Sequence, residues 1–210
     1  KDGNQIRKNV MLHVLEMIRQ SETLSGECKI NMNEASVFHE PTRSLLMPLS
    51  SSNVRTEKSK EGLNGSTFID EVHVVDASFV RRIDRAGISR PEPLHVEVST
   101  SGDDTDSYGY KRYEYAKRVI SGEAEDDATL AMVYEAPQNL KDADLAKDPV
   151  KYGKMANPAW GHTVKESEFL ADYKRSRESL RALADFKMYR LNIWQASATP
   201  WLNMANWDAS

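Results

Sequence analysis

Two short runs of strand-forming residues, each ending in a polar cluster, constrain the fold of this chain most. Residues 66–69 (Ser-Thr-Phe-Ile) lead into the acidic pair Asp70-Glu71, and residues 94–98 (Leu-His-Val-Glu-Val) lead into Ser99-Thr100-Ser101-Gly102. A helix from Asp76 to about residue 86 is expected between them. Strands that alternate with helices indicate a parallel or mostly parallel sheet, whose ligands bind beyond the carboxyl ends of the strands. The pattern therefore predicts one site at the edge of an α/β sheet.

The remaining periodicity adds further helices and strands on both sides of this pair. Apolar residues at helical spacing predict helices over residues 5–19, 107–121, 165–177 and 179–189, the second of them ending at Gly122. Residues 21–26 are expected to break the first helix. Short strands are expected over residues 35–38, 44–49 and 129–134, and a loop or short helices over residues 139–154.

Composition narrows the classes of protein to be considered. The formal net charge of −4 gives no general affinity for nucleic acid, so a DNA-contacting surface would have to be a local patch. The single cysteine, Cys28, permits no internal disulfide, which fits a reducing compartment. No run approaches the roughly 18–20 apolar residues that span a bilayer, and no signal peptide opens the chain. Because Lys1 is not a start methionine and the chain ends abruptly, we expect a piece of a longer protein.

The acidic pair has the residue types that phosphoryl transfer to water requires. An aspartate at the end of a strand can hold Mg²⁺, directly or through a water, because Mg²⁺ prefers oxygen ligands. A glutamate one residue later points elsewhere and can orient or deprotonate an attacking water. Asp70 is therefore the candidate metal ligand, and Glu71 is the candidate catalytic carboxylate. The alternative is that the pair only ends a strand and caps the next turn.

The second cluster supplies hydroxyl groups at a neighbouring strand end. Ser99, Thr100 and Ser101 can hydrogen-bond a γ-phosphate and report its loss, and Gly102 lets the backbone turn sharply. An ordinary polar turn is the alternative. Lys58 and Lys60, in a polar loop upstream, are candidates for a charge that stabilises the transition state.

Two further observations bear on the site. The five histidines show no metal-ligand spacing, and no G-x-x-x-x-G-K-[ST] phosphate-binding loop occurs in the 210 residues. Tyrosines interleave with basic residues over residues 108–118. They either stack on nucleic-acid bases or pack a helix with their hydroxyl groups in water.

The order of these segments resembles the ATPase domain of the large terminase subunit of tailed bacteriophages. The resemblance rests on residues 61–73 (Glu-Gly-Leu-Asn-Gly-Ser-Thr-Phe-Ile-Asp-Glu-Val-His), then residues 98–102, then residues 108–117. Residues 155–161 (Met-Ala-Asn-Pro-Ala-Trp-Gly) look like the Ala-Asn-Pro element of the same proteins, and residues 189–194 look like their continuation. The match covers most of the chain from about Ser59 onward.

The resemblance implies a fold and a domain organisation. The fold class would be α/β, a partial three-layer RecA-like (ASCE) mostly parallel sheet with flanking helices and a small C-terminal helical linker subdomain. Residues 1–135 would form the C-terminal part of the ATPase core, and residues 136–210 a helical lid or linker. The phosphate-binding loop would precede Lys1, and a nuclease domain would follow Ser210.

The resemblance also implies roles and partners. Asp70 and Glu71 would be the Walker B residues, Ser99 to Gly102 the coupling motif, and ATP with Mg²⁺ the cofactors. The complete protein would hydrolyse ATP in a homo-oligomeric ring in the cytoplasm of the bacterial host, whereas the isolated piece would be inactive. Its partners would be double-stranded DNA, the portal protein and the small terminase subunit, without a membrane.

Two other functions remain open from the sequence. Asp70-Glu71-Val72-His73 also matches the D-E-x-H box of helicases, although residues 155–161 and two helices follow where a second RecA-like domain would be expected. A catalytically inert, prophage-derived interaction module is the third possibility.

Overall fold

The computed structural model describes residues 10–49, 65–84 and 91–195 of the chain. The chain divides into two compact units, one of residues 1–67 and 78–94 and the other of residues 68–77 and 95–210. The predicted boundary after residue 135 is not a border of these units, and it stays a prediction. Lys58 and Lys60 lie outside the described residues, as do the start of the first predicted helix and the end of the chain.

The first unit opens with two consecutive helices. Helix α2 (Leu12–Gln20) buries Leu15 and Ile18, as the apolar spacing predicts. Helix α3 (Glu22–Glu27) follows at once, because Ser21 takes an extended conformation and its side chain accepts a hydrogen bond from the amide of Leu24. The first helix thus ends at residue 20, as predicted, but the second helix that starts from the same serine was not predicted.

A three-stranded antiparallel sheet completes the core of this unit. Strands β1 (Cys28–Asn31), β2 (Ser36–His39) and β3 (Ser44–Leu46) are hydrogen-bonded in the order β1-β2-β3. The core joins Met11, Leu15 and Ile18 to Ala35 and Val37. The predicted strands at residues 35–38 and 44–49 are confirmed. The sequence analysis missed β1, whose exposed positions alternate with only half-buried ones and give a weak apolar signal.

Helix α4 (Ala77–Asp84) starts one residue after the predicted cap at Asp76, and all of it after Ala77 belongs to this unit. Its buried side chains are Phe79, Val80 and Ile83.

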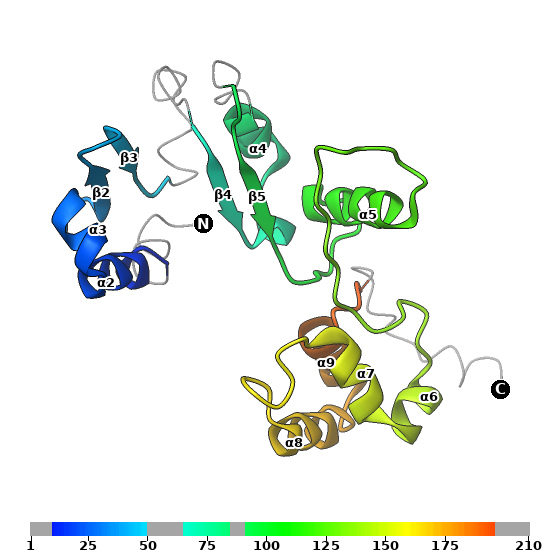
Figure 1. The fold of residues 1–210 in the computed structure, drawn as a ribbon. Helices are drawn as coiled ribbons and strands as arrows, with labels where there is room; N and C mark the ends of the chain where they lie inside the picture. The colour runs from blue at the N-terminus through cyan, green and yellow to red at the C-terminus, as the bar shows by residue number, and fades with distance from the viewer. Residues whose placement is uncertain (1–9, 50–64, 85–90, 196–210) are drawn as a thin grey trace. The chain divides into compact units, whose positions relative to one another are not determined.

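The second unit contains the two strands that precede the polar clusters. Strand β4 (Thr67–Asp70) pairs with β5 (His95–Val98), and the two run side by side in the same direction (Figure 1). A 3₁₀-helix, η3 (Val72–Val74), follows β4. Helix α5 (Tyr108–Ser121) is capped by the Ser107 side chain and ends at Gly122, whose φ of 76° is left-handed. The protein is thus a mixed α/β fold with a small parallel sheet, and the predicted strands and this helix are confirmed.

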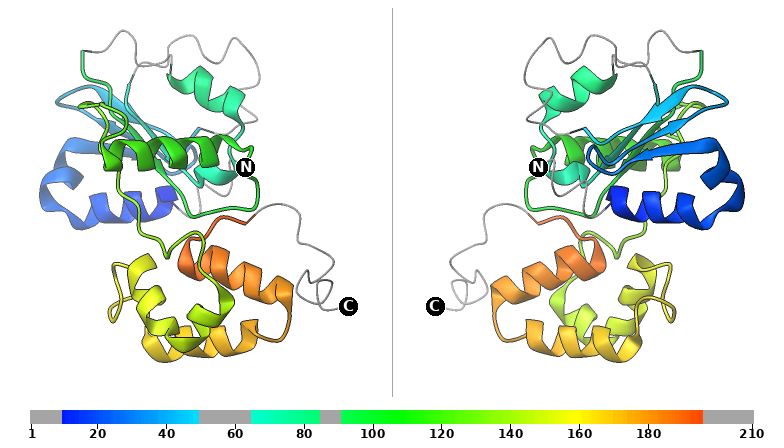
Figure 2. Two further views of the ribbon diagram at one scale, coloured as in Figure 1. Left: turned by 90° about the vertical axis from the view of Figure 1, so that its right-hand side faces the viewer. Right: turned by 90° about the vertical axis from the view of Figure 1, so that its left-hand side faces the viewer.

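Four further helices lie in the described part of the second unit. They are α6 (Asp142–Lys147), α7 (Pro149–Ala156), α8 (Glu166–Ser176) and α9 (Leu180–Leu191). Figure 2 shows α7, α8 and α9 packed together. The Phe169 ring lies at the centre of their core, 5.0 Å from the Trp160 ring and 5.2 Å from the Phe186 ring. A side chain at Gly153 would meet the Trp160 ring at 2.6 Å, so the core requires glycine there.

Residues 129–134 do not form the predicted strand and pair with no strand among the described residues, so this prediction is wrong. Leu130 is 89% exposed and Met132 is 66% exposed, while Ala131 and Val133 between them are half-buried. The period-two alternation is therefore present, but a strand is defined by a ladder of hydrogen bonds to a neighbour.

Candidate functional site

The acidic pair lies at the carboxyl end of β4. Asp70 is exposed, and its Oδ1 accepts a hydrogen bond of 3.0 Å from the Glu71 amide. Glu71 has a left-handed backbone, with φ of 58° and ψ of 49°. A non-glycine residue in this region costs about 1–2 kcal/mol, so the surrounding structure must hold it there. The turn directs the two neighbouring carboxylates to different partners.

His73 joins the acidic pair to the end of the second strand. Its Nδ1 lies 3.3 Å from Glu71 Oε2 and 3.0 Å from Ser99 Oγ, and its amide donates to the same Ser99 oxygen at 3.0 Å. The His73 side chain is only 14% exposed, against 43% for Glu71. Residues from the ends of both strands therefore meet through one imidazole ring.

The four residues of the second cluster, Ser99 to Gly102, form a hydroxyl-rich bend and differ in exposure and in contacts. Ser99 and Thr100 are exposed, whereas Ser101 and Gly102 are buried. Ser101 Oγ donates 2.8 Å to the carbonyl of Met188 in α9, and the Gly102 carbonyl accepts from the amide of Gln195 at 3.0 Å. The first half of the bend is thus exposed, and the second half anchors the segment that follows α9.

Side chains of helix α5 form hydrogen bonds with strand β5 and with the segment that follows the helix. Glu97 of β5 accepts hydrogen bonds from the Tyr108 hydroxyl at 2.6 Å and from Arg112 Nε at 2.7 Å. The Tyr113 hydroxyl donates 2.8 Å to Glu135, and the Tyr115 hydroxyl is bonded to Asp126. These three hydroxyl groups serve the packing of α5, as in the second of the two interpretations of the tyrosines, but their partners are carboxylates.

Two of these bonds shift the ionisation of the groups that make them. Burial, and then the bond to Glu135, raise the pKa of Tyr113 well above its ordinary value. The hydrogen bonds from Tyr115 and Thr129 lower the pKa of Asp126. Both shifts favour the protonation state that each group has at neutral pH.

The carboxylates at the strand end do not enclose a metal ion, but they fit a Mg²⁺ site completed by phosphates and water. No group of three or more His, Cys, Asp or Glu side chains among the described residues could enclose a metal ion. One exposed aspartate beside a glutamate fits a Mg²⁺ ion that takes its other ligands from phosphates and water. Lys58 and Lys60 belong to the part of the chain that is not described, so their relation to the site stays a prediction.

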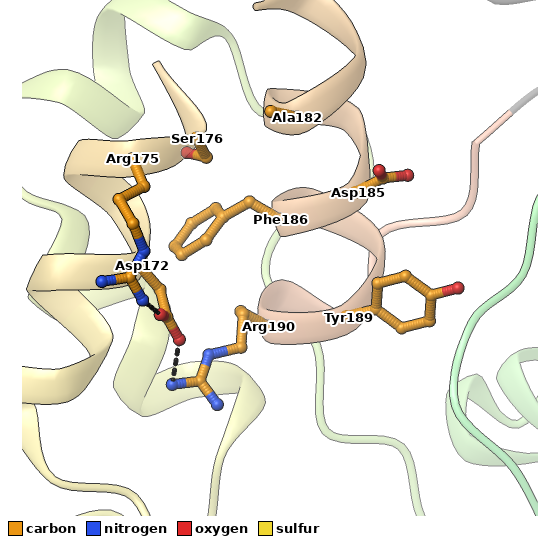
Figure 3. A pocket seen from close by; sticks show the side chains of 8 residues that line it. All are labelled: Asp172, Arg175, Ser176, Ala182, Asp185, Phe186, Tyr189 and Arg190. Atoms are coloured by element: carbon orange, nitrogen blue, oxygen red, sulfur yellow. Dashed lines mark hydrogen bonds and ion pairs between the residues drawn. The ribbon is translucent and has the colours of Figure 1, made fainter. Parts of the chain in front are cut away.

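A shallow hollow of about 300 Å³ lies elsewhere, between α8 and α9 (Figure 3). Arg175 and Arg190 both contact Asp172 there, the second at 2.7 Å. Asp185, Phe186 and Tyr189 lie close by. None of the predicted site residues lines this hollow, and its charges balance, so the strand-end cluster is the candidate site.

Two residues that contact this cluster, Gly109 and Trp194, were not predicted, and neither was the bridge that His73 makes between the two strand ends. Gly109 lies in the first turn of α5, where a Cβ would meet the Cα of His73 at 2.6 Å. A glycine inside a strong helical pattern is the signal that could have indicated this close approach. Trp194 packs edge-on against Tyr110 with ring centroids 5.1 Å apart, and no local pattern links residues so distant in sequence. The role of His73 as a bridge likewise depends on the pairing of two strands.

Comparison with solved structures gives the class of fold. The chain has the fold of part of a bacteriophage large terminase, in agreement with the resemblance of its motifs. The similar structure is the crystal structure of the HK97 bacteriophage large terminase, with a TM-score of 0.73 and 20% sequence identity. The match covers 97% of this chain and 40% of that one, so the chain spans less than half the length of its structural relative.

No family model and no curated protein matches the sequence. No helix among the described residues is long and apolar enough to cross a bilayer.

Proposed function

We propose that this chain is part of a viral DNA-packaging motor, a large terminase subunit that couples ATP hydrolysis to the translocation of double-stranded DNA into a capsid. The observation that carries the proposal is the meeting of Glu71, His73 and Ser99 at the carboxyl ends of two parallel strands. The shared fold with the HK97 large terminase supports it. In the complete protein, β4 and β5 would belong to a three-layer RecA-like sheet.

The roles of the carboxylates follow from their positions. Asp70 is exposed, has one oxygen bonded to the Glu71 amide, and would hold Mg²⁺ directly or through a water. When bound, Mg²⁺ offsets the negative charge of the phosphates during transfer. The Glu71 carboxylate orients the attacking water and accepts its proton. Glu71 is half-exposed and can therefore meet a water from solvent, although His73 holds one of its oxygens.

The hydroxyl-rich bend transmits the outcome of hydrolysis. Thr100 is exposed after the end of β5 and its hydroxyl would hydrogen-bond the γ-phosphate, whereas the Ser99 hydroxyl already donates to the Thr100 carbonyl. Ser101 and Gly102 are tied to α9 and to the segment after it, so a shift of the bend moves those elements. Either Lys58 or Lys60 supplies a positive charge to the transition state, in the same or in a neighbouring subunit.

The chain does not supply every part that the reaction needs. Its sequence contains no phosphate-binding loop of the Walker A type, so the main-chain donors for the β- and γ-phosphates come from elsewhere in the motor. We therefore expect the 210-residue chain alone to show no ATP turnover. The partners of the complete protein would be DNA, the portal protein, the small terminase subunit and further copies of itself in a ring, in the host cytoplasm.

The test is ATP turnover by the longest natural gene product that contains this sequence. Mg²⁺-dependent turnover should be stimulated by double-stranded DNA and should fall at least about 100-fold in Glu71→Gln, which keeps the shape of the side chain and removes the base. Glu123→Gln, on an exposed glutamate after α5, is the matched control and should leave turnover unchanged. Packaging of DNA into empty capsids supports a motor, whereas strand separation without packaging would assign a helicase. No turnover in the parent protein would leave the interaction module as the explanation.

A further inference from the structure

The hydrogen bonds around Ser99 fix which nitrogen of His73 carries its proton. The Ser99 hydroxyl donates its one hydrogen to the Thr100 carbonyl at 2.8 Å, and its oxygen accepts from the His73 amide. The contact of 3.0 Å between Ser99 Oγ and His73 Nδ1 is then favourable only if Nδ1 is the donor. Glu71 Oε2, which can only accept, lies 3.3 Å from the same nitrogen. Both neighbours therefore assign the Nδ1–H form.

The other side of the His73 ring rests against the bend. A Cβ at Gly102 would lie 3.3 Å from the Cβ and Cδ2 atoms of His73 and 3.2 Å from a ring carbon of Trp194. The His73 and Trp194 side chains thus both pack where a larger residue at this position would carry its Cβ. Trp194 is held in turn, because its amide donates 2.9 Å to Gln138 and its ring packs on Tyr110 and Tyr113.

We propose that His73 is a positioning residue: its Nδ1–H holds the Glu71 carboxylate, and its contact with Gly102 links the place of that carboxylate to Trp194. The inference rests on the proposed function, because it assigns a regulator to the same catalytic carboxylate. Movement of the segment after α9 changes the position of Gly102 and hence of the imidazole. The helical part of this unit can thereby set whether Glu71 is aligned for attack by water.

Two substitutions of His73 distinguish the effect of losing the hydrogen bond from Nδ1 from the effect of losing the volume of the ring. His73→Asn places an amide where Nδ1 lies, so it retains a donor for Glu71 and Ser99. His73→Gln places its amide at the position of Nε2 and loses that donor. Both are smaller than histidine and uncharged, so a role in packing alone would affect the two alike.

The kinetic test uses the longest natural gene product, with Glu71→Gln beside the two His73 variants. We expect kcat of His73→Asn to stay within about threefold of the parent and kcat of His73→Gln to fall tenfold or more with KM unchanged, as for loss of a bond made to a charged group. Equal kcat in both variants, whether both retained or both lost, overturns the inference, while loss of turnover in Glu71→Gln still supports Glu71 as the catalytic carboxylate. Turnover that survives Glu71→Gln overturns the proposed function and the inference together.

A second readout does not depend on turnover. In protein labelled with 5-fluorotryptophan, the ¹⁹F resonance of Trp194, identified by its loss in Trp194→Phe, should shift when Mg²⁺ and ADP or a non-hydrolysable ATP analogue are added. The shift should persist in His73→Asn and be lost in His73→Gln. The Trp160 resonance, from the core of the helices, is the internal control. A Trp194 shift of equal size in both variants would show that the link does not pass through the Nδ1 donor.

Discussion

Gly109 and His73 touch backbone to backbone: a Cβ built at Gly109 would lie 2.6 Å from the Cα and 2.8 Å from the amide nitrogen of His73. Helix α5 therefore fixes the main chain of the candidate site directly, with no side chain between them. Rigid backbone atoms cannot move aside as the end of a flexible side chain can. The site should accordingly be more sensitive to one methyl group here than to most substitutions at its rim.

Gly109→Ala should displace η3, weaken the bonds of His73 to Ser99 and Glu71, and lower the free energy of unfolding by about 1–3 kcal/mol, as overpacking does. Thermal and urea unfolding measure the effect. Gly26→Ala is the control, because nothing lies within 4 Å of a Cβ at that helical position. It should be neutral or stabilising by up to about 1 kcal/mol, from the higher helix propensity of alanine. Equal effects of the two substitutions would contradict the close approach.

The left-handed backbone of Glu71 predicts that glycine at this position gives a more stable protein than alanine. Glu71→Ala and Glu71→Gly both remove the carboxylate and its contact with His73, but only glycine adopts a φ of 58° without strain. Glu71→Gly should therefore be more stable than Glu71→Ala by about 1 kcal/mol, and both should be catalytically inactive. Urea denaturation gives the difference directly. If alanine were as stable as glycine, the strained turn would not exist in solution.

Asn157, in the Ala-Asn-Pro element, joins the ends of two helices. Its Nδ2 donates to the Gly153 carbonyl at 2.8 Å and to the Arg190 carbonyl at 3.0 Å. Asn157→Ala leaves both carbonyls without this donor and should cost about 1–3 kcal/mol of stability. Asn139→Ala, at an exposed position before α6, is the control and should change the unfolding midpoint little. Calorimetry of the three proteins tests the contribution.

The raised pKa of Tyr113 predicts a loss of stability at alkaline pH. Because the folded protein holds the phenol protonated more firmly than the unfolded chain does, this contribution is fully present below the ordinary tyrosine pKa of about 10 and is lost as the pH rises above it. Tyr113→Phe removes the titrating group and should flatten the fall of the melting temperature between pH 9.5 and 11, about one unit around that value. Tyr189→Phe, at a side chain 62% exposed, should keep the slope of the parent protein. Identical slopes in all three proteins would exclude the buried bond to Glu135.

The sequence predicted best what local chemistry determines. Ser107 and Gly122 delimit α5 by the rules of helix caps, and the apolar runs before Asp70 and Ser99 define β4 and β5. Predicting the role of a residue from its type alone gave a less complete description of the site. The three hydroxyl residues of the bend were given the same role, yet Ser101 is buried against Met188, 87 positions away.

The wrong and missed predictions share one cause: they depend on contacts with residues distant in the chain, which the local sequence does not specify. Residues 129–134 have the alternation of a strand, but a ladder requires a neighbouring strand, and the described residues provide none. The bridge made by His73 likewise appears only once the strands ending at residues 70 and 98 are paired.

The two anchors of the bend, Ser101 on Met188 and Gly102 on the amide of Gln195, bear on how this protein can be dissected. A truncated version that stopped after α5 would keep both carboxylates and the imidazole in its sequence. It would nevertheless lose the backbone acceptor and donor that hold the hydroxyl-rich turn in register, and it would open the packed side of Gly102 to water. Deletion of the C-terminal helices would therefore impair the strand-end chemistry even though no catalytic side chain had been removed, so a deletion series cannot by itself locate the active residues.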